Sequence, residues 1–131
     1  MENYKRNEKG FIAIKIEEFY VYEDLVGEGC IAANKITKDG YHVGYMYRDE
    51  HSEAYPDSGW RFFAGDESSE YSNEPENFNI FSLNTICNYD EAIIKYLDAP
   101  IGTYLIRINE DEFIVDDEQS EIFMSKMKEE K

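Results

Sequence analysis

The sequence YHVGYMYRDEHSEAYPDSGWRFFAGDE, residues 41–67, decides how this chain folds. It contains the only tryptophan, Trp60, and two apolar arms at residues 42–48 and 59–64 that are rich in Val, Tyr, Trp and Phe. These residue types favour the pleated, half-buried surface of a β-sheet, so both arms are predicted to be strands. Between them, residues 49–58 carry several carboxylates and the strand breaker Pro56. The stretch therefore predicts a β-hairpin with an acidic and mobile tip.

The second arm also predicts which side chains enter the core. Successive residues of a strand point to opposite faces. Trp60 and Phe62 are therefore expected on the buried face, with Arg61 and Phe63 on the other. Arginine pairs with carboxylates in a bidentate manner, so we expect Arg61 to pair with an acid within residues 49–67 and to serve structure.

The neighbouring segments are predicted to extend an antiparallel sheet. Residues 30–37 form an apolar run that Lys38-Asp39-Gly40 connects to residues 41–47. An Asp-Gly pair between two apolar runs is a strong hairpin signal, because both central positions of the favoured turn need positive φ. We therefore expect 30–37 to pair with 41–47. Residues 104–115 alternate in the same way and predict a second hairpin.

Residues 83–97 carry the helical part of the pattern, with apolar residues three and four positions apart. Asn88 followed by Glu91 resembles a capping box for a helix over residues 89–97. Ser82 fits the cap of a preceding turn, which leaves two short helices with a break near Asn88 as the alternative. The expected core residues are Trp60, Phe62, Ile86, Ile93 and Leu97. The sequence thus predicts an α+β fold, with a mainly antiparallel sheet of hairpins and a short helical region at about 83–97 packed on one face.

A length of 131 residues fits a single domain, residues 1–131. Alternation in residues 11–22 predicts one more strand, with a helix as the alternative. Residues 117–131 are predicted to be a polar tail that adds a short helix or an arm, with Ile122, Phe123 and Met127 as its apolar contacts.

Cys30 and Cys87 lack metal-binding spacing and are predicted to be buried free thiols, so no metal or cofactor is expected. No apolar run reaches the length of a membrane span and no signal peptide is recognisable, so a cytoplasmic protein is expected.

The charge balance is strongly acidic, with 29 acidic residues against 13 basic ones and a formal net charge of -16. Such a field repels nucleic acids and anionic membranes and attracts basic protein partners. Residues 49–76 hold nine carboxylates and a single arginine, interleaved with aromatic residues. This segment is either a solvated rim or a docking face for a basic partner. The candidate partner-binding residues are Asp49, Glu50, Glu53, Tyr55, Asp57, Asp66, Glu67, Glu70 and Tyr71.

Several blocks of the sequence occur in the order and spacing of a known family. They include CIAANKIT at 30–37, VGYMYR at 43–48, DSGWRFFAGDE at 57–67, LNTI at 83–86 and NYD at 88–90. Over residues 28–108 or so, the chain resembles the domain of unknown function 2185 family, also called the immunity protein 33 family. The N-terminal extension 11–26 and the C-terminal tail lie outside that core. The resemblance implies a small cytoplasmic bacterial protein that serves as the antidote in a polymorphic toxin system, with no catalytic residues to carry over.

Three classes of function follow from these features. An immunity protein would bind and neutralise a cognate toxin through an acidic surface, because many toxins have a basic substrate cleft. The alternative is an interaction or regulatory module without a toxin. A metal-dependent or thiol enzyme is the least supported class, since His51 is a lone histidine among the carboxylates of the acidic tip and the two cysteines lack a recognisable base. The oligomeric state is not predicted.

Overall fold

The structure is a computed structural model and describes residues 5–14 and 29–129. One six-stranded sheet in the order β4-β1-β3-β2-β5-β6 forms its centre. The strands are β1 (Gly29–Ala33), β2 (Tyr45–Arg48), β3 (Asp57–Phe63), β4 (Phe78–Ser82), β5 (Tyr104–Arg107) and β6 (Phe113–Val115). The pair β1 and β3 is parallel, and the other neighbouring pairs are antiparallel. The predicted α+β fold with a mainly antiparallel sheet is confirmed.

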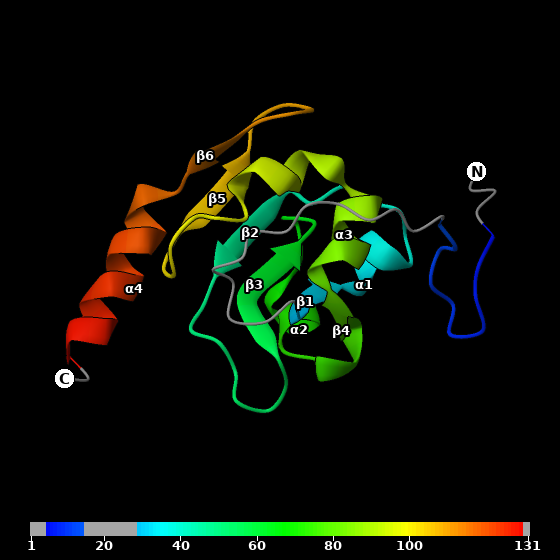
Figure 1. The fold of residues 1–131 in the computed structure, drawn as a ribbon, viewed down its shortest axis with the longest axis horizontal. Helices are drawn as coiled ribbons and strands as arrows, with labels where there is room; N and C mark the ends of the chain where they lie inside the picture. The colour runs from blue at the N-terminus through cyan, green and yellow to red at the C-terminus, as the bar shows by residue number, and fades with distance from the viewer. Residues whose placement is uncertain (1–4, 15–28, 130–131) are drawn as a thin grey trace.

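Short helices connect the strands. They are α1 (Asn34–Thr37), α2 (Ser69–Ser72), α3 (Leu83–Tyr89) and α4 (Asp117–Glu129), with 3-10 helices η1 (Pro75–Asn77) and η2 (Glu91–Tyr96). The side chains of α3 and η2 pack on one face of the sheet, and α4 extends from the β5–β6 side of the molecule (Figure 1). Within the described ranges, no helix is long and apolar enough to cross a membrane.

The central hairpin forms as predicted. β2 and β3 are antiparallel, with Tyr45 opposite Phe63 and Arg48 opposite Trp60. Trp60 and Phe62 point into the core and are fully buried. The indole Nε1 of Trp60 donates a hydrogen bond of 3.1 Å to the carbonyl oxygen of Leu97, so the tryptophan also ties the sheet to the end of η2. All five predicted core residues are fully buried: Trp60, Phe62, Ile86, Ile93 and Leu97.

The predicted hairpin between residues 30–37 and 41–47 is wrong. β1 ends at Ala33 and the chain turns into α1, because this turn buries Ile36 in the core. The Asp-Gly pair closes that helix, with the backbone N–H of Asp39 bonded to the carbonyl oxygen of Asn34. β1 lies instead between β3 and β4, and the place beside β2 is taken by β3 and β5.

The helical region is divided into two elements with a break at Asp90. The hydroxyl of Ser82 caps α3, and the carboxylate of Asp90 caps η2. The alternative of two short helices is therefore confirmed, whereas the capping box of Asn88 and Glu91 is wrong. The amide of Asn88 donates instead to the carbonyl oxygen of Asn84, one turn earlier in α3.

The two ends of the chain complete the fold. The hairpin predicted at 104–115 is confirmed as β5 and β6, and the polar tail forms the 13-residue helix α4. Ile122 on α4 is exposed, whereas the side chains of Phe123 and Met127 lie outside the described residues. Near the N-terminus, Arg6 and Ile12 form an antiparallel bridge. The rest of the predicted strand at 11–22, and most of the extension 11–26, lie outside the described residues.

Candidate functional site

The sheet has two unlike faces. One face packs against α3 and η2 through Met46, Trp60, Phe62 and Leu105. The opposite face, called the open face below, receives the alternate side chains of the same strands. These are Ile31, Tyr45, Tyr47, Arg61, Phe63, Tyr104 and Ile106. Most of the predicted binding residues lie before or after β3, toward the two ends of this open face.

Asp57 lies at the start of β3, and its side chain is buried rather than exposed at the hairpin tip. It binds the guanidinium of Arg61 with two hydrogen bonds, of 2.8 and 3.0 Å, which confirms that Arg61 pairs with an acid of this region. Burial raises the pKa of Asp57, but the bonds from Arg61 and from the backbone N–H groups of Ser52 and Gly59 outweigh it and hold the pKa at about 2. Asp57 is therefore a structural residue, and the expectation that it belongs to the exposed acidic surface is wrong.

The remaining tip residues stay near the surface. Glu50 and Glu53 are exposed, while Asp49 and Tyr55 are half-buried. The N–H of Asp49 donates 2.8 Å to the carbonyl oxygen of Gly59, which fixes the base of the tip to β3. We call Asp49, Glu50 and Glu53 the tip acids.

The second group of predicted residues begins after the other end of β3. Asp66 forms an ion pair of 3.0 Å with Lys35. The carboxylate of Glu67 accepts hydrogen bonds from two backbone N–H groups and so shapes the turn. Glu70 is exposed, and the hydroxyl of Tyr71 accepts from the backbone N–H of Lys35 at 3.1 Å. We call Asp66, Glu67 and Glu70 the loop acids.

The structure therefore separates the predicted binding residues into two acidic groups. The seven residues of β3 lie between them. Between the groups lies the open face, where partly exposed aromatic rings line up across neighbouring strands. The sequence prediction did not include Tyr47, Phe63 or Tyr104 as site residues. Alternation along β3 places Phe63 on the face away from Trp60 and is the signal for that residue, whereas Tyr47 and Tyr104 join it through the pairing of β2 with β3 and β5.

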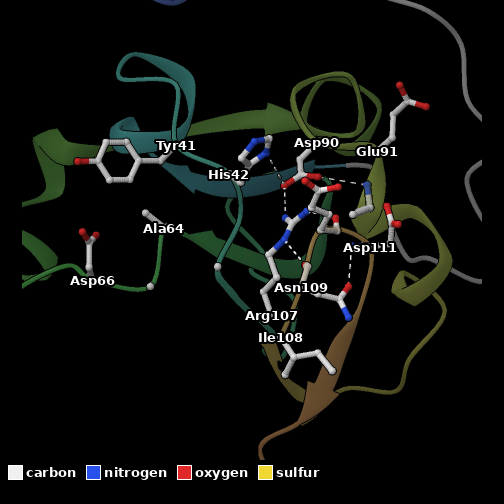
Figure 2. Close-up of a pocket in the computed structure, with 14 residues that line it drawn as sticks. Tyr41, His42, Ala64, Asp66, Asp90, Glu91, Arg107, Ile108, Asn109 and Asp111 are labelled. Carbon is white, nitrogen blue, oxygen red and sulfur yellow. Dashed lines mark hydrogen bonds and ion pairs between the residues drawn. The ribbon is translucent and has the colours of Figure 1, made fainter.

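A separate hollow of about 920 Å³ opens near the start of β2 and the β5–β6 hairpin. Figure 2 shows Arg107 reaching toward Asp90, with His42 close beside that carboxylate. Arg107 and Asp90 form an ion pair of 2.6 Å, and Nδ1 of His42 lies 3.6 Å from the same carboxylate. Asp90 also accepts a hydrogen bond of 2.9 Å from the backbone N–H of Val43. The floor of the hollow is thus an internally neutralised network that joins β2, β5 and η2.

The rim of this hollow is acidic. Asp66 lies on one side of it, and Glu91 and Asp111 lie on the other (Figure 2). The histidine in it, His42, has a side chain that is 76% exposed, so water surrounds most of its ring.

The cysteines and the histidine that the sequence offered as candidate catalytic groups lie in different surroundings. Cys30 and Cys87 are buried free thiols, as predicted. Burial raises the pKa of both, that of Cys87 to about 12, which disfavours the reactive thiolate. His51 is exposed in the tip. Within the described part of the chain, no group of three or more His, Cys, Asp and Glu side chains has a metal-binding arrangement.

Comparison with known families decides the class of the chain. The Immunity protein Imm33 domain matches residues 30–118. This chain belongs to the Imm33 immunity protein family. The Imm33 match runs from the buried Cys30 of β1 into the first turn of α4. It extends beyond residue 108, where the sequence resemblance ended, and takes in all six strands apart from Gly29, both acidic groups and the hollow. No curated protein and no solved structure matches the chain.

Proposed function

We propose that this Imm33 domain binds a cognate toxin of a bacterial polymorphic toxin system in the cytoplasm and neutralises it through an acidic surface. The observation that carries the proposal is the Imm33 match over nearly the whole sheet. A formal net charge of -16, with tip acids and loop acids at opposite ends of the open face, supports a basic partner surface. Complementary charge accelerates encounter and favours the correct partner.

The chain would neutralise the toxin by occupying its substrate cleft. A toxin that acts on an anionic substrate, such as a nucleic acid, needs a basic cleft to hold it. An acidic protein that covers this cleft excludes the substrate without any chemistry of its own. The hairpin base, fixed by the ion pair of Asp57 and Arg61, would hold the tip acids toward such a cleft.

Co-expression tests this function. The reading frame next to the gene for this chain is searched for a toxin domain, which is then expressed in a bacterial host, alone and together with the chain. Restored growth and co-purification of the two proteins at low salt are expected. Unchanged toxicity despite equal amounts of folded chain would contradict the proposal. Capture of a regulatory protein in place of a toxin would support the alternative of an interaction module.

A further inference from the structure

A row of aromatic rings crosses the open face from α2 to β5. It consists of Tyr71, Phe78, Phe63, Tyr47 and Tyr104, and we call it the aromatic row. The ring centroids of successive members lie 5.9, 5.6, 5.8 and 4.7 Å apart. The rings of Tyr47 and Tyr104 are nearly parallel, at 7°. Lateral contacts of this kind fix the rings, so a partner meets a surface that is already ordered.

The aromatic row lies in a shallow apolar surface. A hollow of about 550 Å³ opens beside it and is lined in part by Ile31, Phe63, Phe78 and Ile80. Ile80 on β4 is 58% exposed and Ile106 on β5 is 37% exposed. Large apolar side chains exposed together on one face are typical of an interaction surface.

The charges around the aromatic row are mostly negative. Arg61 lies on the same face, but Asp57 neutralises its guanidinium. Burial and the charge of Asp49 raise the pKa of Tyr47, and this tip acid follows Tyr47 by two residues along the chain. At the other side, the hydroxyl of Tyr45 donates 3.2 Å to Asp116. A second copy of this chain carries the same excess of acids, so electrostatic repulsion disfavours it as the occupant.

One basic side chain of the protein already binds in the manner that this surface favours. Nζ of Lys35 lies 5.3 Å from the ring centroid of Tyr71, at the end of the aromatic row, and 3.0 Å from the carboxylate of Asp66. The ammonium group thus uses an aromatic ring and an acid at the same time. Arginine and lysine side chains suit this combination, because their apolar stems cover rings while their charged ends reach carboxylates.

We propose that the aromatic row docks a basic segment of the toxin, with arginine or lysine stems across the rings and their charged ends at the flanking tip acids and loop acids. This inference rests on the proposed function and names the chemistry of the partner surface. In this arrangement the tip acids attract the basic segment during the encounter, and the aromatic row makes the close contact with it in the complex.

The test uses three variants that each replace an exposed isoleucine by lysine. Ile80→Lys and Ile106→Lys place a positive charge on the open face. Ile108→Lys is the matched control, because Ile108 is 52% exposed and lines the other hollow (Figure 2). Thermal unfolding of each variant verifies the fold, which exposed positions should leave nearly unchanged.

The first measurement titrates the labelled chain with a hexa-arginine peptide and follows Tyr and Phe ring signals and Ile methyl signals by NMR. Shifts at the aromatic row are expected, with affinity reduced about tenfold in Ile80→Lys and Ile106→Lys and less than about twofold in Ile108→Lys. Equal losses in all three variants, or shifts confined to the tip, would overturn the inference. So would light scattering that shows a dimer dissociated by Ile80→Lys, since the open face would then bind a second copy.

The same variants separate this inference from the proposed function. If the unmodified chain protects cells from the toxin and Ile80→Lys and Ile106→Lys protect equally well, the immunity function stands and the docking role of the aromatic row fails. If the unmodified chain gives no protection, the immunity function fails, and the peptide titration still decides whether the aromatic row binds a basic segment.

Discussion

Asp57 and Arg61 are brought together by a bulge in β3. Gly29 of β1 pairs with Asp57 of β3, and Ile31 pairs with Arg61. Two steps along β1 are therefore matched by four steps along β3. The extra residues include Gly59, which has a φ of 92°. A regular strand would extend about 13 Å over four residues, so the bulge shortens the distance that the ion pair must bridge. The base of the acidic tip therefore depends on one glycine and one buried ion pair.

Replacing Gly59 by alanine should disrupt this bulge. A Cβ atom there would lie 2.1 Å from the carbonyl oxygen of Asp49, in addition to the strain of the positive φ. Gly10 is the control, because its φ of 87° is similar and a Cβ atom there would meet nothing within 4 Å. In urea unfolding we expect the free energy of unfolding to fall by about 1 kcal/mol in Gly10→Ala and by at least about 3 kcal/mol in Gly59→Ala. Equal losses would show that the close approach to Asp49 is unimportant.

The Asp57 carboxylate should make stability depend on acid pH. Its pKa of about 2 in the folded protein is below the ordinary value of 3.8. The stabilisation is therefore fully present above about pH 4 and is lost as the pH falls through 2, and it amounts to about 2 kcal/mol. In urea unfolding, the difference in free energy of unfolding between wild type and Asp57→Asn should narrow as the pH falls over this range. Asp98→Asn, at an exposed position, is the control; an equally acid-dependent difference for that variant would contradict the assignment.

Trp60→Ala should lower the free energy of unfolding by about 3–5 kcal/mol, because a large buried side chain leaves a cavity. Trp60→Phe fills part of that space but loses the hydrogen bond to the carbonyl oxygen of Leu97, so an intermediate loss is expected. Far-ultraviolet circular dichroism in urea measures both losses of stability, since Trp60 is the only tryptophan and neither variant keeps a tryptophan fluorescence signal. A loss below about 1 kcal/mol with toxin binding abolished would identify Trp60 as a contact residue instead.

Thr37→Val should be neutral or stabilising. Thr37 is fully buried, and its hydroxyl has no hydrogen-bond partner among the described residues. Valine has nearly the same shape and removes the unpaired polar group, so a gain of up to about 1 kcal/mol is expected in urea unfolding. Thr37→Ala, which leaves a small cavity, should be less stable than Thr37→Val. Destabilisation by valine greater than that by alanine would show that the hydroxyl is bonded.

The hairpin and the core were predictable from the sequence because their signals are local. Alternation along residues 59–64 assigns Trp60 and Phe62 to one face whatever lies beside the strand. The neighbour of β1 was not predictable in this way. The Asp-Gly pair after residues 30–37 favours a hairpin locally, but the segment gains more by burying Ile36 in α1 and by pairing β1 with β3, which is distant in sequence.

The candidate site was predictable only in part, for a similar reason. The acids of residues 49–70 are visible in the sequence, but nothing local distinguishes the buried Asp57 from its exposed neighbours. Its burial depends on the bulge at Gly59 and on Arg61. The aromatic row depends on the lateral order of the strands, which places Phe78 of β4 next to Phe63 of β3 across β1.

The acidic surface beside the open face is the part of the molecule proposed to bind the toxin. The most direct test of this proposal compares two variants that each lose three acids. One changes the tip acids, as Asp49→Asn, Glu50→Gln and Glu53→Gln. The other changes exposed acids of α4, as Asp117→Asn, Glu118→Gln and Glu121→Gln. Asp57 and Asp116 are left unchanged, since one holds Arg61 and the other accepts from Tyr45.

The measurement is the association rate with the toxin domain identified by the co-expression test, in low and in high salt. Exposed charges near a contact act mainly on the encounter, so the tip variant should associate at least about tenfold more slowly than wild type in low salt. In high salt the difference in association rate between the tip variant and wild type should largely disappear. The α4 variant should associate at nearly the wild-type rate at both salt concentrations. Equal slowing of the two variants would mean that only the total charge matters, and it would contradict a localised binding surface.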